Sequence, residues 1–280
     1  MIRRSIVLTT AAASALLLAA CAPQSSGGSS SSAPAPSSSA ASSSAPAPAS
    51  SSASASPSAS ADPCAKDSLN LIAPGTLTIG TDSPAYPPYF VDNDPSNGQG
   101  FESAVAYAVA NGLGFSPEEV AWTTVPFNKS YAPGAKDFDF DINQISITPK
   151  RAEAVTFSDG YYTVNQAVIA LADSPIANAT TLAELQNAKL GAQVGTTSLQ
   201  YITDFVKPTA EPYVYNDTND AKSALKNGQI DGIVVDLPTA YYITAVEIPK
   251  GKIVGQFPAA DENGEQFGLL FQKEIGRAHV

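Results

Sequence analysis

The chain contains 280 residues, with 26 acidic residues against 15 Lys and Arg and a formal net charge of −11 at pH 7. All of the Asp and Glu lie at or after Asp62, so the part that can fold is acidic and is not expected to bind nucleic acid. The one histidine is His279, near the end of the chain. Residues 62–273 therefore offer neither a histidine-based catalytic site nor a histidine-containing zinc site, and we expect no metal and no cofactor.

The N-terminus has the pattern of a secretory signal peptide. Arg3 and Arg4 precede an apolar stretch of small residues that ends in Leu18-Ala19-Ala20, directly before Cys21. The stretch is too short and too rich in Ala for a membrane span. Its end resembles the bacterial lipobox, which implies that residues 1–20 are removed and that Cys21 carries a lipid. An ordinary signal peptide cleaved near this site is the alternative.

A segment of Ser, Ala and Pro follows the signal. Residues 22–61 contain no charged residue, and such a composition cannot bury enough apolar surface to offset chain entropy. We expect residues 21–61 to be a disordered tether that holds a domain beside the outer face of the bacterial cytoplasmic membrane. In that oxidising setting Cys64 has no visible partner, so it either pairs with a Cys beyond this chain or stays a free thiol.

A first series of elements is predicted between residues 77 and 147. We expect a short strand at 77–79, a helix at 101–113, a β segment at 120–127 and a half-buried strand at 138–147. The helix has apolar residues at helical spacing, which are expected to face the core: Phe101, Val105, Ala108 and Val109. In the last strand apolar residues alternate with polar ones, so one face is expected to be buried.

A second series alternates in the same way. Residues 164–171 form a near-continuous apolar run, and Thr181 with Glu184 three residues later predicts a capping box. Further strands are predicted at 190–194, 213–215 and 230–235, and helices at 196–206, at 220–226 and from Pro238. Residues 267–271 read as a strand that returns to the first series. Alternating strands and helices indicate an α/β fold, and a chain that leaves one lobe and comes back makes two crossings, a natural hinge.

Several motifs together resemble one protein family across residues 75–273. The matching pieces, in order, are Ile79-Gly80-Thr81-Asp82 with Tyr86-Pro87-Pro88, Gly100-Phe101-Glu102, Ile145-Ser146-Ile147-Thr148 with Arg151, Phe157-Ser158, Gly195-Thr196-Thr197, and Gly228-Gln229-Ile230-Asp231 leading to Asp236. The chain resembles the extracytoplasmic solute-binding proteins of amino-acid ABC importers. The resemblance implies the two-lobed type II periplasmic-binding-protein fold, with lobe 1 at 62–162, lobe 2 at 163–262 and a return hinge strand at 263–273.

The C-terminal residues read differently from the rest. Residues 274–280, EIGRAHV, match the translation of a common sequencing adapter. We therefore expect them to be an artefact and the last part of lobe 1 to be missing. The only histidine belongs to this stretch.

The family resemblance implies a site for a zwitterion, which needs a fixed cation and a fixed anion because burying an unpaired charge is costly. Arg151, the only Arg between residues 62 and 273, would bind the ligand carboxylate through its rigid fork, with Ser146 and Thr148 beside it. Asp236 ends an apolar strand and would bind the ammonium. The alternatives are a surface arginine and a helix-capping carboxylate.

The remaining candidates would complete the cleft. Thr196 and Thr197 open a helix after Gly195 and could receive the ligand carboxylate, or act only as helix caps. Tyr86 and Phe127 would be aromatic walls, with core packing as the alternative for Phe127. Asp82 either contacts a polar ligand side chain or shapes its loop. The departures from the family pattern at Asn143-Gln144 and in residues 130–134 leave the identity of the amino acid open.

The mechanism implied by the resemblance is closure of two lobes around an amino acid, with no covalent step. The expected partners are the amino acid, an ABC permease with its ATPase, and the membrane through Cys21, and the expected form is a monomer. The rival interpretation is a cyclohexadienyl-dehydratase-like enzyme, with Asp82 or Asp236 as the acid or base. A third is a ligand-sensing module without transport.

Overall fold

The computed structural model describes residues 65–257 and 264–273. All of these belong to one compact unit, which spans Ser58–Val280. The expectations for the signal peptide, Cys21, the tether, Cys64 and residues 274–280 lie outside the described residues. Within the described ranges, no helix is both long and apolar enough to cross a membrane.

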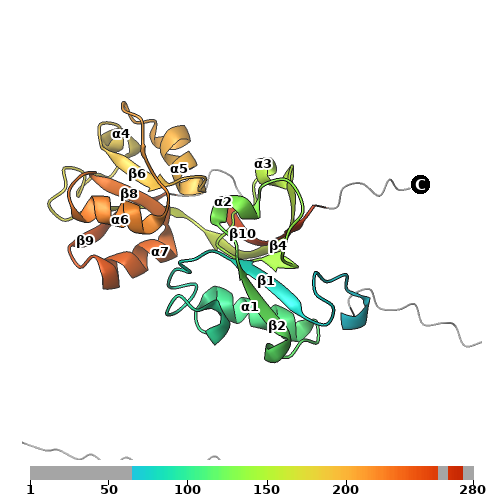
Figure 1. Cartoon of the computed structure of the whole chain (residues 1–280). Helices are drawn as coiled ribbons and strands as arrows, with labels where there is room; N and C mark the ends of the chain where they lie inside the picture. The colour runs from blue at the N-terminus through green and yellow to red at the C-terminus, as the bar shows by residue number, and fades with distance from the viewer. Residues whose placement is uncertain (1–64, 258–263, 274–280) are drawn as a thin grey trace, which may run out of the picture. The chain divides into compact units, whose positions relative to one another are not determined.

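The first lobe is built on a mixed sheet with the strand order β2-β1-β3-β10-β4 among the described residues. Its strands are β1 (Leu77–Thr81), β2 (Val120–Thr124), β3 (Phe140–Asp141), β4 (Val155–Val164) and β10 (Glu265–Gln272). β1 pairs in parallel with β2 and β3, whereas β10 runs antiparallel to β3 and β4. The predicted return strand at 267–271 is confirmed, because β10 comes back from the far end of the chain and enters the first sheet (Figure 1).

The second lobe is built on a second mixed sheet, with the order β7-β6-β8-β5-β9 in the described part of the chain. Its strands are β5 (Gln166–Leu171), β6 (Leu190–Gln193), β7 (Tyr213–Tyr215), β8 (Gly232–Asp236) and β9 (Gly251–Phe257). The central β5 and β8 are buried almost throughout, as expected for strands covered on both faces. β9 was not predicted, since its residues neither alternate nor form an apolar run.

Helices follow the strands in both lobes (Figure 1). They are α1 (Phe101–Gly112), α2 (Phe127–Ser130) and α3 (Pro149–Ala152) in the first lobe, and α4 (Leu182–Leu185), α5 (Thr197–Tyr201), α6 (Thr218–Lys226) and α7 (Leu237–Tyr242) in the second. The capping box of Thr181 and Glu184 at the start of α4 is confirmed. α5 and α7 each continue into one π-helical turn, at Ile202–Val206 and Ile243–Glu247.

The buried face of α1 differs from the prediction. Val105 and Val109 are partly buried against the first core, but Phe101 and Ala108 are exposed, and Glu102 is fully buried instead. The Glu102 carboxylate tolerates burial because it accepts hydrogen bonds from the backbone N–H of Gln144 at 2.7 Å and from the hydroxyl of Tyr161. Polar partners on β4 and in the loop after β3 thus allow the face of α1 that carries Glu102 to point inward.

The predicted half-buried strand at 138–147 is also wrong in part, because only Phe140 and Asp141 form strand β3. The alternation fails at Asp141, which is 0 % exposed, as buried as its apolar neighbours. Its carboxylate packs over Gly80 of β1, where an added Cβ would lie 2.6 Å from Oδ2. Glycine at residue 80 therefore makes the room that the buried carboxylate occupies.

The chain passes from the first sheet to the second at a single residue. β4 ends at Val164 and β5 begins at Gln166, so the apolar run predicted as one strand is broken at Asn165. The carbonyl of Asn165 accepts from the N–H of Leu237, at the start of α7. Gln166, which begins β5, and Glu265, which begins β10, belong to the functional site described next.

Candidate functional site

A small cavity lies between the two lobes. Its volume is about 60 Å³, well below the roughly 300 Å³ at which small-molecule pockets usually begin. The predicted site residues that line it are Asp82, Tyr86 and Phe127 from the first lobe and Thr196, Thr197 and Asp236 from the second. Asn143, Gln144, Gln193 and Thr218 also contribute to the wall. Entry of an amino acid would require the two walls to separate.

Asp82 follows β1, where it shapes its loop and lines the cavity. Its carboxylate accepts from the N–H of Ser83 at 2.7 Å and of Phe127 at 3.1 Å, which fixes the loop. Burial raises the pKa of Asp82, and the nearby charge of Asp217 raises it further. Asp82 and Asp217 belong to different lobes, so the two lobes bring like charges together here.

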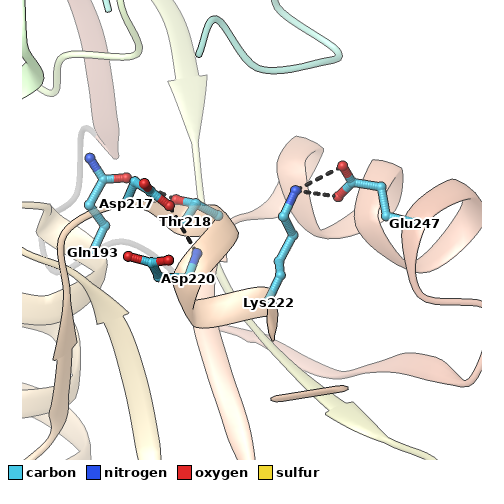
Figure 2. A network of polar contacts seen from close by, with 6 residues as sticks. All are labelled: Gln193, Asp217, Thr218, Asp220, Lys222 and Glu247. Carbon is cyan, nitrogen blue, oxygen red and sulfur yellow. Dashed lines mark hydrogen bonds and ion pairs between the residues drawn. The ribbon is translucent and has the colours of Figure 1, made fainter. Parts of the chain in front are cut away.

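Tyr86 reaches from the first lobe to α6 of the second. Its ring lies 5.5 Å from the ammonium of Lys222, and its buried hydroxyl finds no hydrogen-bond partner among the described residues. Burial raises the pKa of Tyr86. Figure 2 shows Lys222 extended from α6 toward Glu247, with which it forms an ion pair of 2.8 Å. In the same view Thr218 donates to the side chain of Gln193 at 2.9 Å, which fixes a second polar group of the wall.

Arg151 lies at the lobe boundary and is 8 % exposed, so it is not a surface arginine. α3 carries it, and Thr148 caps this helix by accepting from the N–H of Arg151 at 3.1 Å. The guanidinium donates to the carbonyl of Ser146 at 2.7 Å and, across the lobes, to the carbonyl of Gly195 at 3.0 Å. Burial lowers the pKa of Arg151. In the described ranges Arg151 forms no ion pair with a carboxylate.

Aromatic rings cover the guanidinium. Tyr131 lies 4.7 Å from it and Phe127 5.5 Å, and the two rings meet edge to face at 5.6 Å. Phe127 is 9 % exposed and packs in a core cluster, as its alternative predicted, and it also lines the cavity.

The structure divides the predicted carboxylate-binding residues between two hollows. Thr148 and Arg151 line an open groove of about 1440 Å³ rather than the small cavity. Thr196 and Thr197 line both hollows. Thr196 and Thr197 therefore separate Arg151 from the small cavity. Arg151 instead connects the two lobes through its hydrogen bond to the carbonyl of Gly195.

Asp236 ends β8 and faces the cavity. It precedes α7, but its side chain makes no capping hydrogen bond, so the helix-capping alternative is wrong. Its Oδ1 accepts from Nε2 of Gln166 at 2.7 Å. Burial raises the pKa of Asp236, and the neighbouring charge of Glu265 raises it further. Asp236 is thus a carboxylate held close to a second acidic group.

That second group, Glu265, was missed by the sequence analysis. It begins β10, and its Oε1 accepts from the hydroxyls of Ser146 at 2.5 Å and Thr197 at 2.6 Å. Its Oε2 accepts from Nε2 of Gln166 at 2.9 Å. The one signal that could have indicated it is an acidic residue two positions before the return strand predicted at 267–271.

Thr196 acts as the helix cap of α5. Its hydroxyl accepts from the N–H of Leu199 at 3.1 Å and donates to the carbonyl of Gln193 at 2.8 Å. The neighbouring Thr197 directs its hydroxyl to Glu265 instead. Within residues 65–257 and 264–273, no cluster of His, Cys, Asp and Glu is suited to a metal ion.

Comparisons with known proteins agree with this geometry. Residues 77–235 match the family of bacterial extracellular solute-binding proteins, family 3. The chain is 30% identical over 200 residues to a probable histidine-binding protein of Campylobacter jejuni, covering 71% of this chain and 73% of that one. It is 31% identical over 207 residues to the arginine-binding extracellular protein ArtP of Bacillus subtilis, covering 71% and 74%.

Solved structures agree as well. The fold is similar to that of an ancestral arginine-binding protein bound to arginine, with a TM-score of 0.59, 30% identity and coverage of 71% of this chain and 85% of that one. These relatives are binding proteins, which confirms that the chain is not an enzyme. The α/β architecture with two mixed sheets matches the type II periplasmic-binding proteins, as predicted. The chain belongs to the bacterial extracellular solute-binding proteins, family 3.

Proposed function

We propose that this protein captures an amino acid with a polar side chain between its two lobes and delivers it to an ABC importer. The observation that carries the proposal is the cavity whose two walls come from different lobes, with a carboxylate on each wall, Asp82 and Asp236. The names of the relatives support an amino acid as the ligand.

Asp236 would bind the ligand ammonium. Its Oδ1 is already held by Gln166, so the carboxylate is oriented before the ligand arrives. An arriving ammonium would favour the charged form of Asp236, which its buried setting disfavours. Ser146, Arg151 and Thr197 would receive the ligand carboxylate, and Arg151 would exchange a backbone carbonyl for this stronger, charge-assisted partner.

A cationic side chain suits the other end of the cavity best. The charge of Asp217 disfavours ionisation of Asp82 there, neither carboxylate forms an ion pair with a described residue, and a guanidinium or imidazolium would offset the repulsion. Tyr86 and Phe127 add aromatic faces, each worth about 0.5–2 kcal/mol to a cation. Arginine- and histidine-binding relatives support this side-chain class.

Closure would couple binding to transport. A ligand that contacts both walls favours the closed arrangement by its differential affinity for that state. Lobe 1 at 62–162, lobe 2 at 163–262 and the return strand at 263–273 would then move as the two halves and hinge of a monomer. The permease with its ATPase would recognise the closed form.

The anchor is a separate part of the proposal. A lipid on Cys21 and the tether at 21–61 would keep the protein at the outer face of the cytoplasmic membrane while the lobes reach their ligand. Cys21→Ser should move the protein from the membrane fraction to the medium. Retention of the variant in the membrane fraction would rule out this anchor.

The test of ligand capture is thermal unfolding of the full chain with each common amino acid at about 1 mM. A ligand at about a hundred times its Kd stabilises the folded state by about 2.7 kcal/mol. We expect the largest shift in Tm with arginine or histidine, lost in Arg151→Ala and Asp236→Ala and kept in the control Lys150→Ala, whose residue is exposed on α3. A wild type that responds to no amino acid would refute the proposed function.

A further inference from the structure

Glu265 is the most fully bonded carboxylate at the lobe boundary. Three side chains donate to it: Ser146 and Thr197 to Oε1 and Gln166 to Oε2, at 2.5, 2.6 and 2.9 Å. Two of these donors are deeply buried, since Ser146 is 1 % and Gln166 is 3 % exposed. Without Glu265, the Gln166 amide would keep only Asp236 as an acceptor and the Ser146 hydroxyl only that of Thr197 at 3.3 Å, so the pocket around Glu265 is suited to a carboxylate.

The donors come from both lobes. Ser146 precedes α3 in the first lobe, whereas Thr197 begins α5 and Gln166 begins β5 in the second. The Ser146 and Thr197 hydroxyls also lie only 3.3 Å apart. A single carboxylate oxygen therefore bridges the two lobes, which is the geometry expected of a bound amino acid.

Glu265 has no ion-pair partner among the described residues. Its charge raises the pKa of Asp236. The nearby guanidinium of Arg151 is attracted to Glu265 but donates its hydrogen bonds to backbone carbonyls. Neutral donors thus hold this carboxylate, and a second anion could not bind beside it without repulsion.

We propose that Glu265 is an internal substitute for the ligand carboxylate: it occupies the Ser146 and Thr197 hydroxyls in the ligand-free protein and must leave them when an amino acid binds. This inference rests on the proposed function and adds a residue that sets its affinity. The ligand replaces bonds that already exist, so binding is weaker than the same site would give if it were empty.

Displacement also gives Glu265 a role in the hinge. β10 carries it directly beside the crossing, paired to the end of β4 through Glu265 and Val164. Release of its side chain removes a bond between the lobes at the moment that the ligand supplies another. Glu265 is accordingly a positioning residue for the ligand-free closed arrangement and a competitor for the ligand.

The test compares the full-length wild type with Glu265→Ala and Glu265→Gln by titration calorimetry. The probes are L-arginine, L-histidine and L-glutamine, together with agmatine, which keeps the ammonium and guanidinium of arginine but has no carboxyl group. We expect the Kd for the amino acid that binds to fall about tenfold in Glu265→Ala, or about 1.4 kcal/mol, and less in Glu265→Gln, whose amide oxygen still accepts. Agmatine should not gain, because it has no carboxyl or amide oxygen that competes for the hydroxyls.

Glu211→Ala is the matched control, since this glutamate is exposed on the second lobe, and its Kd should equal that of the wild type. The ligand-free Tm should fall in Glu265→Ala as the bridge is lost, so affinity and stability change in opposite directions. A purely structural residue would not produce tighter binding together with a lower Tm. If Glu265→Ala fails to fold, the Glu265→Gln variant still tests whether the Kd falls.

Three results would overturn the inference while leaving the proposed function intact. They are an unchanged Kd, a Kd raised in both variants as expected if Glu265 held the ligand ammonium, and an equal gain for agmatine. A wild type whose Tm responds to none of the common amino acids would instead refute the proposed function and the displacement with it.

Discussion

Asp139 and Asp141 are two carboxylates on one short segment with opposite expected effects on stability. Asp141 is 0 % exposed, and neither of its oxygens has a hydrogen-bond partner among the described residues. Asp139 accepts from the backbone N–H groups of Ile72 at 2.8 Å and Thr78 at 2.6 Å. We expect Asp141→Asn to stabilise the protein at pH 7.5 and Asp139→Asn to destabilise it.

The magnitude follows from the burial of Asp141. Leaving a buried polar group unsatisfied costs about 1–3 kcal/mol, and more for a charged one. Asn keeps the shape of Asp and is itself a polar group without a partner, but it cannot ionise, so the variant avoids the additional cost of the charge and should gain about 1–3 kcal/mol at pH 7.5. For a folded region of this size, each kcal/mol moves Tm by about 2–4 °C. Asp139→Asn turns an acceptor of two N–H groups into a partial donor and should lose a similar amount.

The pH dependence separates this mechanism from simple repacking. Burial raises the pKa of Asp141 well above its ordinary value, and the charges of Glu102 and Asp82 raise it further. A raised pKa means that the folded state favours the proton, so the contribution of Asp141 to wild-type stability is most favourable below the unfolded pKa of about 3.9 and falls as pH rises. The gain from Asp141→Asn should therefore be largest at pH 7.5 and nearly absent at pH 3.5.

The assay is thermal unfolding of wild type and both variants across that pH range, with circular dichroism to verify the fold. A lower Tm for Asp141→Asn at pH 7.5, or a gain of equal size at pH 3.5 and 7.5, would refute the reasoning. Stabilisation by Asp139→Asn would show that its two backbone hydrogen bonds contribute nothing.

Three further predictions concern other charged groups. Burial raises the pKa of Glu102 to about 7, so the contribution of Glu102 to stability should decline between about pH 4.3 and pH 7. Glu102→Gln should flatten this decline in the free energy of unfolding measured with urea. The same pH dependence in wild type and variant would contradict the raised pKa of Glu102. Asp236→Asn should raise the Kd for the captured amino acid by about 10–100-fold, equivalent to the roughly 1.5–3 kcal/mol of a charged hydrogen bond, and a Kd within a factor of two of wild type would remove Asp236 from the site. The side chain of Lys222 is 8% exposed and that of Glu247 is 28% exposed. Glu247→Ala leaves the buried ammonium unpaired and should lower the free energy of unfolding by about 1–3 kcal/mol, which is more than Lys222→Met should. If urea unfolding gives the reverse order, the ion pair is not what stabilises this contact.

The sequence predicted the fold better than the buried polar groups. The alternation of strands and helices, the return strand and the capping box of α4 follow from local patterns that the structure repeats. The inward face of α1 could not be predicted, because Glu102 is stabilised by Gln144 and Tyr161, which lie 42 and 59 residues away in sequence. Periodicity counts apolar residues and does not detect such partners.

The site shows the same limit. Asp82, Tyr86, Phe127 and Asp236 do line one cavity, because each follows a strand at the edge where the lobes face each other. Glu265 gave almost no signal, since its importance depends on three donors from distant parts of the chain. A residue that acts through long-range hydrogen bonds becomes visible only when the fold brings those parts together.

The place of β10 in the first sheet also constrains how the protein is made. β10 lies between β3 and β4, yet it is the last strand of the described chain. A polypeptide exported from its N-terminus can complete the second sheet from contiguous residues while the first sheet still has a gap, with the edges of β3 and β4 unpaired. Long-range strand pairing is slow and leaves such edges open to aggregation. The first lobe is thus the last to mature and the part that most needs protection during secretion.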